Sequence, residues 1–120
     1  MLVNAEEREE VKQALIRKVG PWAFQSFPRD RWKDAPDRLI IEGALLQAKP
    51  MDRYELLKIY SLDQIKDIWD KYIVIQKLHD HSNIWAAENI FKSQHPNRYV
   101  REHRLRSLRK RASAGYGLSV

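Results

Sequence analysis

The sequence of this 120-residue chain contains no cysteine, so disulfides, thiolate zinc sites and cysteine nucleophiles are all excluded. Long apolar runs are missing as well. The longest apolar clusters are "LII" at 39–41 and "YIVI" at 72–75, whereas a membrane-spanning helix needs about 20 apolar residues. Glutamates crowd positions 6–10, where a secretory signal would be apolar. We therefore expect no membrane association and a cytoplasmic location.

Signatures of catalysis are also missing. The chain has only four glycines, and it contains no glycine-rich phosphate loop, no nucleophile elbow and no H-E-x-x-H zinc motif. Each of these motifs supplies a reactive or phosphate-binding group at a fixed place in a fold. We therefore expect a protein that is not an enzyme, with no catalytic residues and no cofactor.

Two polar clusters have spacings that a metal ion could use. His79 and His81 form a His-x-His pair at the end of an expected helix, but a zinc site needs further ligands. Asp63, Asp67 and Asp70 recur at spacings of four and three on one helix face, interleaved with lysines. Such a stripe is more typical of the solvated face of an amphipathic helix. We expect no metal site in either cluster.

Positive charge is concentrated at the end of the chain. Of the formal net charge of +6, residues 92–120 carry eight Lys or Arg against one acidic residue, and the preceding residues are nearly neutral. The densest stretch is "REHRLRSLRKR" at 101–111. This asymmetry predicts a helical domain over 1–91 and a basic extension over 92–120 that meets an anionic surface.

The candidate binding residues are the seven arginine and lysine side chains from position 98 onward. Arginine's planar guanidinium makes bidentate contacts to phosphate or carboxylate. If residues 98–112 are helical, Leu105, Leu108 and Ala112 form a thin apolar seam and the cations cover the remaining circumference. Nucleic-acid phosphates, an acidic protein surface and plain solvent all remain open as surroundings. The seven residues are Arg98, Arg101, Arg104, Arg106, Arg109, Lys110 and Arg111.

Apolar spacings of three and four predict an all-α protein. We expect a single compact bundle of about five to six short helices, with the basic segment as a C-terminal helix or arm. Asn4 is expected to cap the first helix, and Gly20-Pro21 to end it. Ser61, in the capping-box pattern "SLDQ", is expected to start a central helix that runs to about Leu78. Gly43, inside a helical pattern, indicates close packing of a neighbour.

An aromatic segment follows the first expected helix. The stretch "PWAFQSFPRDRWKDAP", at 21–36, has three prolines and four aromatic residues but no clean period. We expect an ordered loop, because a disordered linker rarely carries so many rings. Its rings are candidates for an apolar contact with a partner. They are Trp22, Phe24, Phe27 and Trp32.

Three stretches resemble a known family. "PDRLIIEGALL", "YELLKIYSLDQIKDIW" and the aromatic start of the next helix are similar to small all-helical bacterial proteins encoded beside nucleotidyltransferase toxins of the AbiEii type. That family is regarded as antitoxin-like. Its aromatic pair reads Phe-Trp where this chain has Ile84-Trp85, and the resemblance spans about Pro21 to Phe91. The basic extension lies outside it.

The resemblance implies a binding role without catalysis. On this interpretation the protein is an antitoxin or regulatory partner of an acidic toxin enzyme, such as a nucleotidyltransferase. A cationic segment would suit the clustered carboxylates of that enzyme's cleft. The alternative is a small nucleic-acid-binding protein that uses the same cations on phosphates. The sequence leaves the oligomeric state open.

Overall fold

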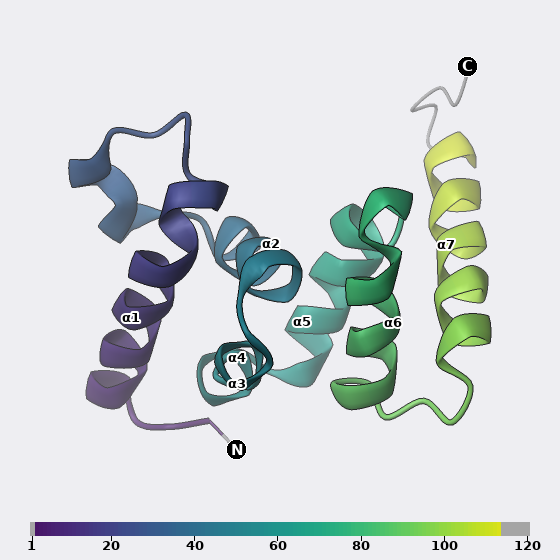
Figure 1. Ribbon diagram of the computed structural model, residues 1–120, viewed down its shortest axis with the longest axis horizontal. Coiled ribbons are helices and arrows are strands. Elements are labelled where there is room, and N and C mark those ends of the chain that lie inside the picture. The colour runs from purple at the N-terminus through teal and green to yellow at the C-terminus, as the bar shows by residue number, and fades with distance from the viewer. Residues whose placement is uncertain (1, 114–120) are drawn as a thin grey trace. The chain divides into compact units, whose positions relative to one another are not determined.

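The computed structural model describes residues 2–113, in which every regular element is a helix and no strand occurs (Figure 1). The all-α prediction is confirmed. No helix among these residues is long and apolar enough to cross a membrane. Residues 114–120 of the expected basic extension lie outside the described residues. The elements are α1 (Ala5–Ala23), η1 (Arg29–Asp34), α2 (Asp37–Gln47), α3 (Pro50–Tyr54), α4 (Leu56–Ile59), α5 (Leu62–Ile68), η2 (Trp69–Ile73), η3 (Lys77–His79), α6 (Asp80–Asn89) and α7 (Pro96–Ser113).

Contacts divide the described chain into two compact units, residues 2–65 and 66–113, with the division inside α5. The first unit contains α1 to α4 and η1. The second contains η2, η3, α6 and α7. The boundary expected after Phe91 lies inside the second unit, between α6 and α7, and these two helices pack against each other (Figure 1).

Two helix starts follow the capping rules. The Asn4 side chain accepts a hydrogen bond from the backbone N–H of Glu7 at 2.9 Å. The Ser61 hydroxyl accepts one from the backbone N–H of Gln64 at 3.1 Å. Each bond satisfies a backbone donor that has no partner within its own helix. Both predicted caps are confirmed.

The predicted end of the first helix is wrong. α1 continues through Gly20 and Pro21 to Ala23. The glycine has a packing role, because a Cβ placed on it would lie 2.5 Å from Cε3 of the Trp32 ring. Gly20 therefore makes room for an indole that lies directly on the helix backbone.

The aromatic segment is ordered but is less of a loop than expected. Its first residues belong to α1, and η1 occupies its second half. Phe24 is fully buried, and its ring centroid lies 5.8 Å from that of Trp32 and 6.2 Å from that of Phe27. The Phe24 ring thus packs against both of the other two rings, whereas Trp22 is 38% exposed.

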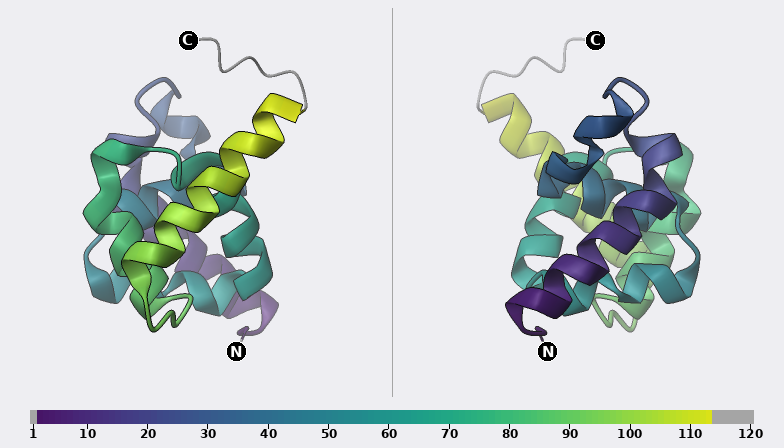
Figure 2. Two further views of the ribbon diagram at one scale, coloured as in Figure 1. Left: turned by 90° about the vertical axis from the view of Figure 1, so that its right-hand side faces the viewer. Right: turned by 90° about the vertical axis from the view of Figure 1, so that its left-hand side faces the viewer.

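The first unit is built around the contact between α1 and α2, and the right-hand view of Figure 2 faces α1. A Cβ placed on Gly43 would lie 3.0 Å from the Cβ of Ala23 and 3.1 Å from that of Val19. The predicted close approach is confirmed. Fully buried side chains of this unit include Leu15, Val19, Phe24, Ile40, Ile41, Leu45, Leu56, Ile59 and Tyr60.

The central helix is shorter than the sequence predicts. α5 ends at Ile68, and the chain widens into the π-helical turn η2, where the Val74 N–H donates to the Trp69 carbonyl at 2.8 Å. The helix therefore does not reach Leu78, which is 96% exposed. Backbone carbonyls of this turn and of Val74 after it accept hydrogen bonds from side chains of α7.

Trp69 is at the centre of the second unit and is fully buried. Its indole N–H donates to Oδ1 of Asn83 at 3.1 Å, and the Asn83 amide donates to the Gln76 carbonyl at 3.3 Å. Its ring centroid lies 5.0 Å from that of Phe91 and 5.8 Å from that of Tyr99. This aromatic cluster connects η2 to α6, to the following turn and to the first turns of α7.

Candidate anion-binding surface

One side of α7 is anchored to the rest of the second unit by its own arginine. The Nε of Arg104 donates to the carbonyl oxygen of Val74 at 2.7 Å, and the same guanidinium forms an ion pair with Asp80 in the first turn of α6. Carbonyls at a helix end have no donor within their own helix. Arg104 therefore supplies a donor for a carbonyl at the end of η2, and it also neutralises the charge of Asp80.

Two further side chains of α7 bond to carbonyls of η2. The Ser107 hydroxyl donates to the Asp70 carbonyl at 2.7 Å, and the Arg111 guanidinium donates to the Lys71 carbonyl. Ser107 and Arg111 are four residues apart, so they lie on the same helix face one turn from each other. These contacts fix both the position and the rotation of α7.

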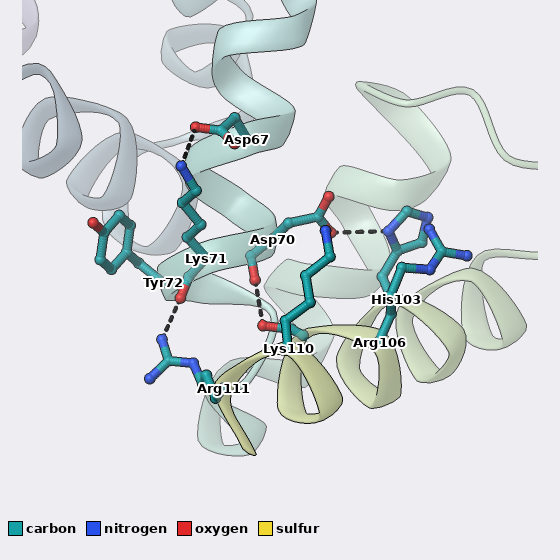
Figure 3. A pocket seen from close by; sticks show the side chains of 9 residues that line it. Asp67, Asp70, Lys71, Tyr72, His103, Arg106, Lys110 and Arg111 are labelled. Carbon is teal, nitrogen blue, oxygen red and sulfur yellow. Dashed lines mark hydrogen bonds and ion pairs between the residues drawn. The ribbon is translucent and has the colours of Figure 1, made fainter. Parts of the chain in front are cut away.

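His103 belongs to the same docked face. It is buried, its Nδ1–H donates to Oδ1 of Asp70 at 2.8 Å, and its ring centroid lies 4.1 Å from that of Tyr99 (Figure 3). An aspartate of the predicted acidic stripe thus contacts a histidine of the basic segment. The pair connects η2 to the middle of α7.

The predicted apolar seam of the basic helix is wrong. Leu105 is 47% exposed and Ala112 is exposed, while Leu108 is half-buried. The side of α7 that packs on η2 instead carries side chains that donate hydrogen bonds to backbone carbonyls of η2. Its buried members are Val100, His103 and Ser107.

Five of the seven predicted binding residues face solvent. In residues 2–113 none of the five makes a hydrogen bond or an ion pair, whereas Arg104 and Arg111 make the internal contacts above. The left view of Figure 2 looks onto α7. The five are Arg98, Arg101, Arg106, Arg109 and Lys110.

A groove lies between two walls. One wall is α7, and the other consists of η2 and the end of α5. The volume of the groove is about 420 Å³, and Figure 3 shows the side chains that form its walls. Aspartates and a tyrosine come from one wall, and most of the cations come from α7. The lining residues are Asp67, Asp70, Lys71, Tyr72, His103, Arg106, Ser107, Lys110 and Arg111.

The groove carries an excess of positive charge. Nζ of Lys71 lies 3.1 Å from Oδ2 of Asp67, and this hydrogen bond, reinforced by the carboxylate's charge, raises the pKa of the lysine. Asp70 accepts from His103, so both acids of the groove have partners within the unit. Arg106 and Lys110 provide exposed cations that have no ion pair among the described residues.

The two groove cations that come from the exposed side of α7 can act on one ligand group. Arg106 and Lys110 are four residues apart, which places their side chains on adjacent turns of the same flank, about 5–6 Å apart at Cβ. Figure 3 shows both rising from α7 beside Asp70 and His103. An oxyanion between them would receive charge-assisted hydrogen bonds from both.

The clusters considered for metal binding do not converge. Within the described residues no group of three or more His, Asp or Glu side chains could hold a metal ion. His79 is half-buried, His81 is exposed, and Asp63 is exposed on α5. The groove and the docked polar face of α7 were not predicted. A signal was present in the i, i+4, i+8 spacing of His103, Ser107 and Arg111.

No family model, curated protein or solved structure matches this chain. The resemblance to antitoxin-like proteins over about Pro21 to Phe91 therefore stays a prediction. A functional assignment has to rest on the geometry of α7 and its groove.

Proposed function

We propose that this protein is a non-enzymatic binding protein that holds nucleic acid through the outer side of α7. The observation that carries the proposal is the set of five exposed cations on one helix, none with a partner in the described part of the chain. Cations that contact phosphates release the counterions condensed on nucleic acid, and this release drives binding.

The docking of α7 makes these cations a fixed surface. From Arg98 to Lys110 they extend over about 18 Å at 1.5 Å per residue. Arg104, Ser107 and Arg111 hold the helix on η2, so its backbone is already ordered before any ligand arrives. Such preorganisation lowers the entropy cost of binding.

Nucleic acid fits this surface better than a protein partner does. Stable protein interfaces centre on buried apolar or aromatic side chains with charges around them. Among the described residues of α7, Leu105 is the only large apolar side chain that is exposed. One exposed leucine is too little apolar surface for the centre of such an interface, so the exposed arginines match a phosphate backbone better.

Fluorescence anisotropy of a labelled oligonucleotide tests the proposal. The double variant Arg101→Gln and Arg109→Gln removes two exposed cations of α7. The matched control, Arg17→Gln and Arg31→Gln, removes the same charge from exposed positions in the first unit. We expect the α7 variant to bind at least tenfold more weakly and the control to stay within about twofold. Equal losses in both variants would show a non-specific effect of net charge and would contradict the proposal.

An acidic protein partner is the second candidate, and Leu105 favours it. This side chain is 47% exposed on the outer side of α7, on the same face as Arg101 and Arg109. A phosphate backbone offers no apolar contact to Leu105, but an acidic toxin enzyme could supply one. The antitoxin-like role belongs to this candidate.

The Leu105→Gln variant separates the two candidates. A stoichiometric protein from the native host that resists about 0.5 M salt on the wild-type chain, and is lost with Leu105→Gln, would support the protein partner. Unchanged oligonucleotide affinity in the same variant, with no retained protein, would leave nucleic acid as the ligand.

A further inference from the structure

We propose that the groove beside α7 is a subsite for one unstacked nucleotide, so that the protein binds single strands in preference to duplexes. This inference rests on the proposed nucleic-acid binding and names the form of nucleic acid that the same surface takes. In this arrangement a strand runs along the outer side of α7, and one of its nucleotides turns into the groove.

The phosphate of that nucleotide binds at the wall of the groove that α7 forms. Arg106 and Lys110 belong both to the exposed cationic side of α7 and to the groove, so they connect the two. Lys71 and Arg111 add positive charge, against Asp67 and Asp70. Four cations against two aspartates leave the groove attractive to a phosphate group.

The base of the nucleotide binds at the opposite wall, which η2 forms. Tyr72 is half-buried and lines the groove from η2. In Figure 3 its ring lies at one end of the site, and His103 with Arg106 lies at the other. Stacking of a base on an aromatic side chain contributes about 1–3 kcal/mol and tolerates any base, because every base has a π-face.

The groove has the size for such a ligand. Its volume of about 420 Å³ falls within the range of small-molecule sites, about 300–1,000 Å³. A base in a duplex is stacked and paired, and taking it out costs a few kcal/mol. A base in a single strand is unpaired and only stacks on its neighbours, so taking it out costs least there. The groove therefore adds affinity for a single strand that it cannot add for an intact duplex.

The test compares a labelled single strand of about 12 nucleotides with the duplex of the same sequence, within the site sizes known for single-strand binders. Four variants are compared with the wild-type chain by anisotropy. Tyr72→Leu removes the ring and Tyr72→Phe keeps it. Lys110→Gln removes a groove cation, and Lys77→Gln removes an exposed cation outside the groove as the matched control.

We expect the wild-type chain to bind the single strand at least tenfold more tightly than the duplex. Tyr72→Leu should weaken binding to the strand by about 5- to 160-fold, the range that corresponds to one base stack, and leave duplex binding unchanged. Tyr72→Phe and Lys77→Gln should keep the preference, while Lys110→Gln should reduce it. Thermal unfolding of each variant shows whether it is folded.

Equal wild-type affinity for strand and duplex would overturn the inference and leave the proposed function standing, because α7 would still bind phosphates. This comparison needs no variant, so it decides the matter even if Tyr72→Leu does not fold. Failure to bind either form would remove the proposed function together with the inference.

Discussion

The Nε of Arg104 lies 2.7 Å from the carbonyl oxygen of Val74, and this contact divides the cations of α7 into two groups. Arg104 and Arg111 donate to backbone carbonyls of the second unit and hold the helix in place. Arg98, Arg101 and the other exposed cations project to solvent. All seven were assigned the same role from the sequence, because the predicted seam, Leu105, Leu108 and Ala112, is not the side of α7 that packs on the unit.

The division predicts unequal effects of two arginine substitutions on stability. Arg104→Gln removes the bonds to Val74 and Asp80 and should lower the free energy of unfolding by about 1–3 kcal/mol. Arg101→Gln, at an exposed position of the same helix, should change it by less than about 0.5 kcal/mol. Urea titration followed by circular dichroism measures both. Equal effects of the two substitutions would contradict the docked orientation of α7.

Gly20 provides a test of packing in the first unit. A methyl group at this position would meet the Trp32 ring at 2.5 Å, and a rigid indole cannot turn away as a flexible chain can. Overpacking costs about 1–3 kcal/mol, while alanine recovers about 1 kcal/mol of helix propensity. Gly20→Ala should therefore destabilise the protein by about 1 kcal/mol in thermal or urea unfolding.

A double-mutant cycle shows whether Trp32 is the cause. In the Trp32→Leu background the added methyl group has space, so Gly20→Ala should be neutral or stabilising there. The same destabilisation in both backgrounds would mean that the ring does not lie on Gly20.

These cases show what the sequence could reveal about the fold. The caps at Asn4 and Ser61 were predictable because each depends on residues three positions apart. The end of α1 was not predictable, because Gly20 serves to make room for the ring of Trp32, which comes from a later element. The end of α5 was hidden for another reason. The apolar spacing continues past Ile68, and neither glycine nor proline marks the π-helical turn.

Tyr60 predicts how stability depends on alkaline pH. Burial first, and then its hydrogen bond to Asp37 at 2.7 Å, raise the pKa of this phenol well above its ordinary value of about 10. Below pH 10 the phenol is neutral in both the folded and the unfolded chain, so its contribution is fully present. Above pH 10 it ionises in the unfolded chain alone, and stability falls as the pH rises.

The slope gives the size of this effect. One such group lowers the free energy of unfolding by up to about 1.4 kcal/mol per pH unit above pH 10. Urea unfolding between about pH 8 and 11.5 measures it, and the Tyr60→Phe variant should lose this part of the slope. The same slope in the variant and in the wild type would mean that Tyr60 is not the buried group that titrates.

The candidate site could be predicted only in part. Charge alone indicated the segment and the sign of its partner. The outward side of α7 is set by hydrogen bonds from Ser107 and Arg111 to backbone carbonyls of η2. The spacing of apolar residues in the sequence carries no information about such bonds. The groove depends on Asp70 and Tyr72 standing beside residues more than 30 positions later in the chain.

The most direct test of the central claim is the salt dependence of oligonucleotide affinity. Each phosphate neutralised in a single strand contributes about 0.7 to the slope of log K against log salt concentration, so five contacts predict a slope of about −3.5. The Arg101→Gln and Arg109→Gln double variant should lower its magnitude by about 1.4, while the Arg17→Gln and Arg31→Gln control should leave it unchanged. A slope of magnitude below about 1 in the wild-type chain would contradict the claim that the outer side of α7 holds nucleic acid.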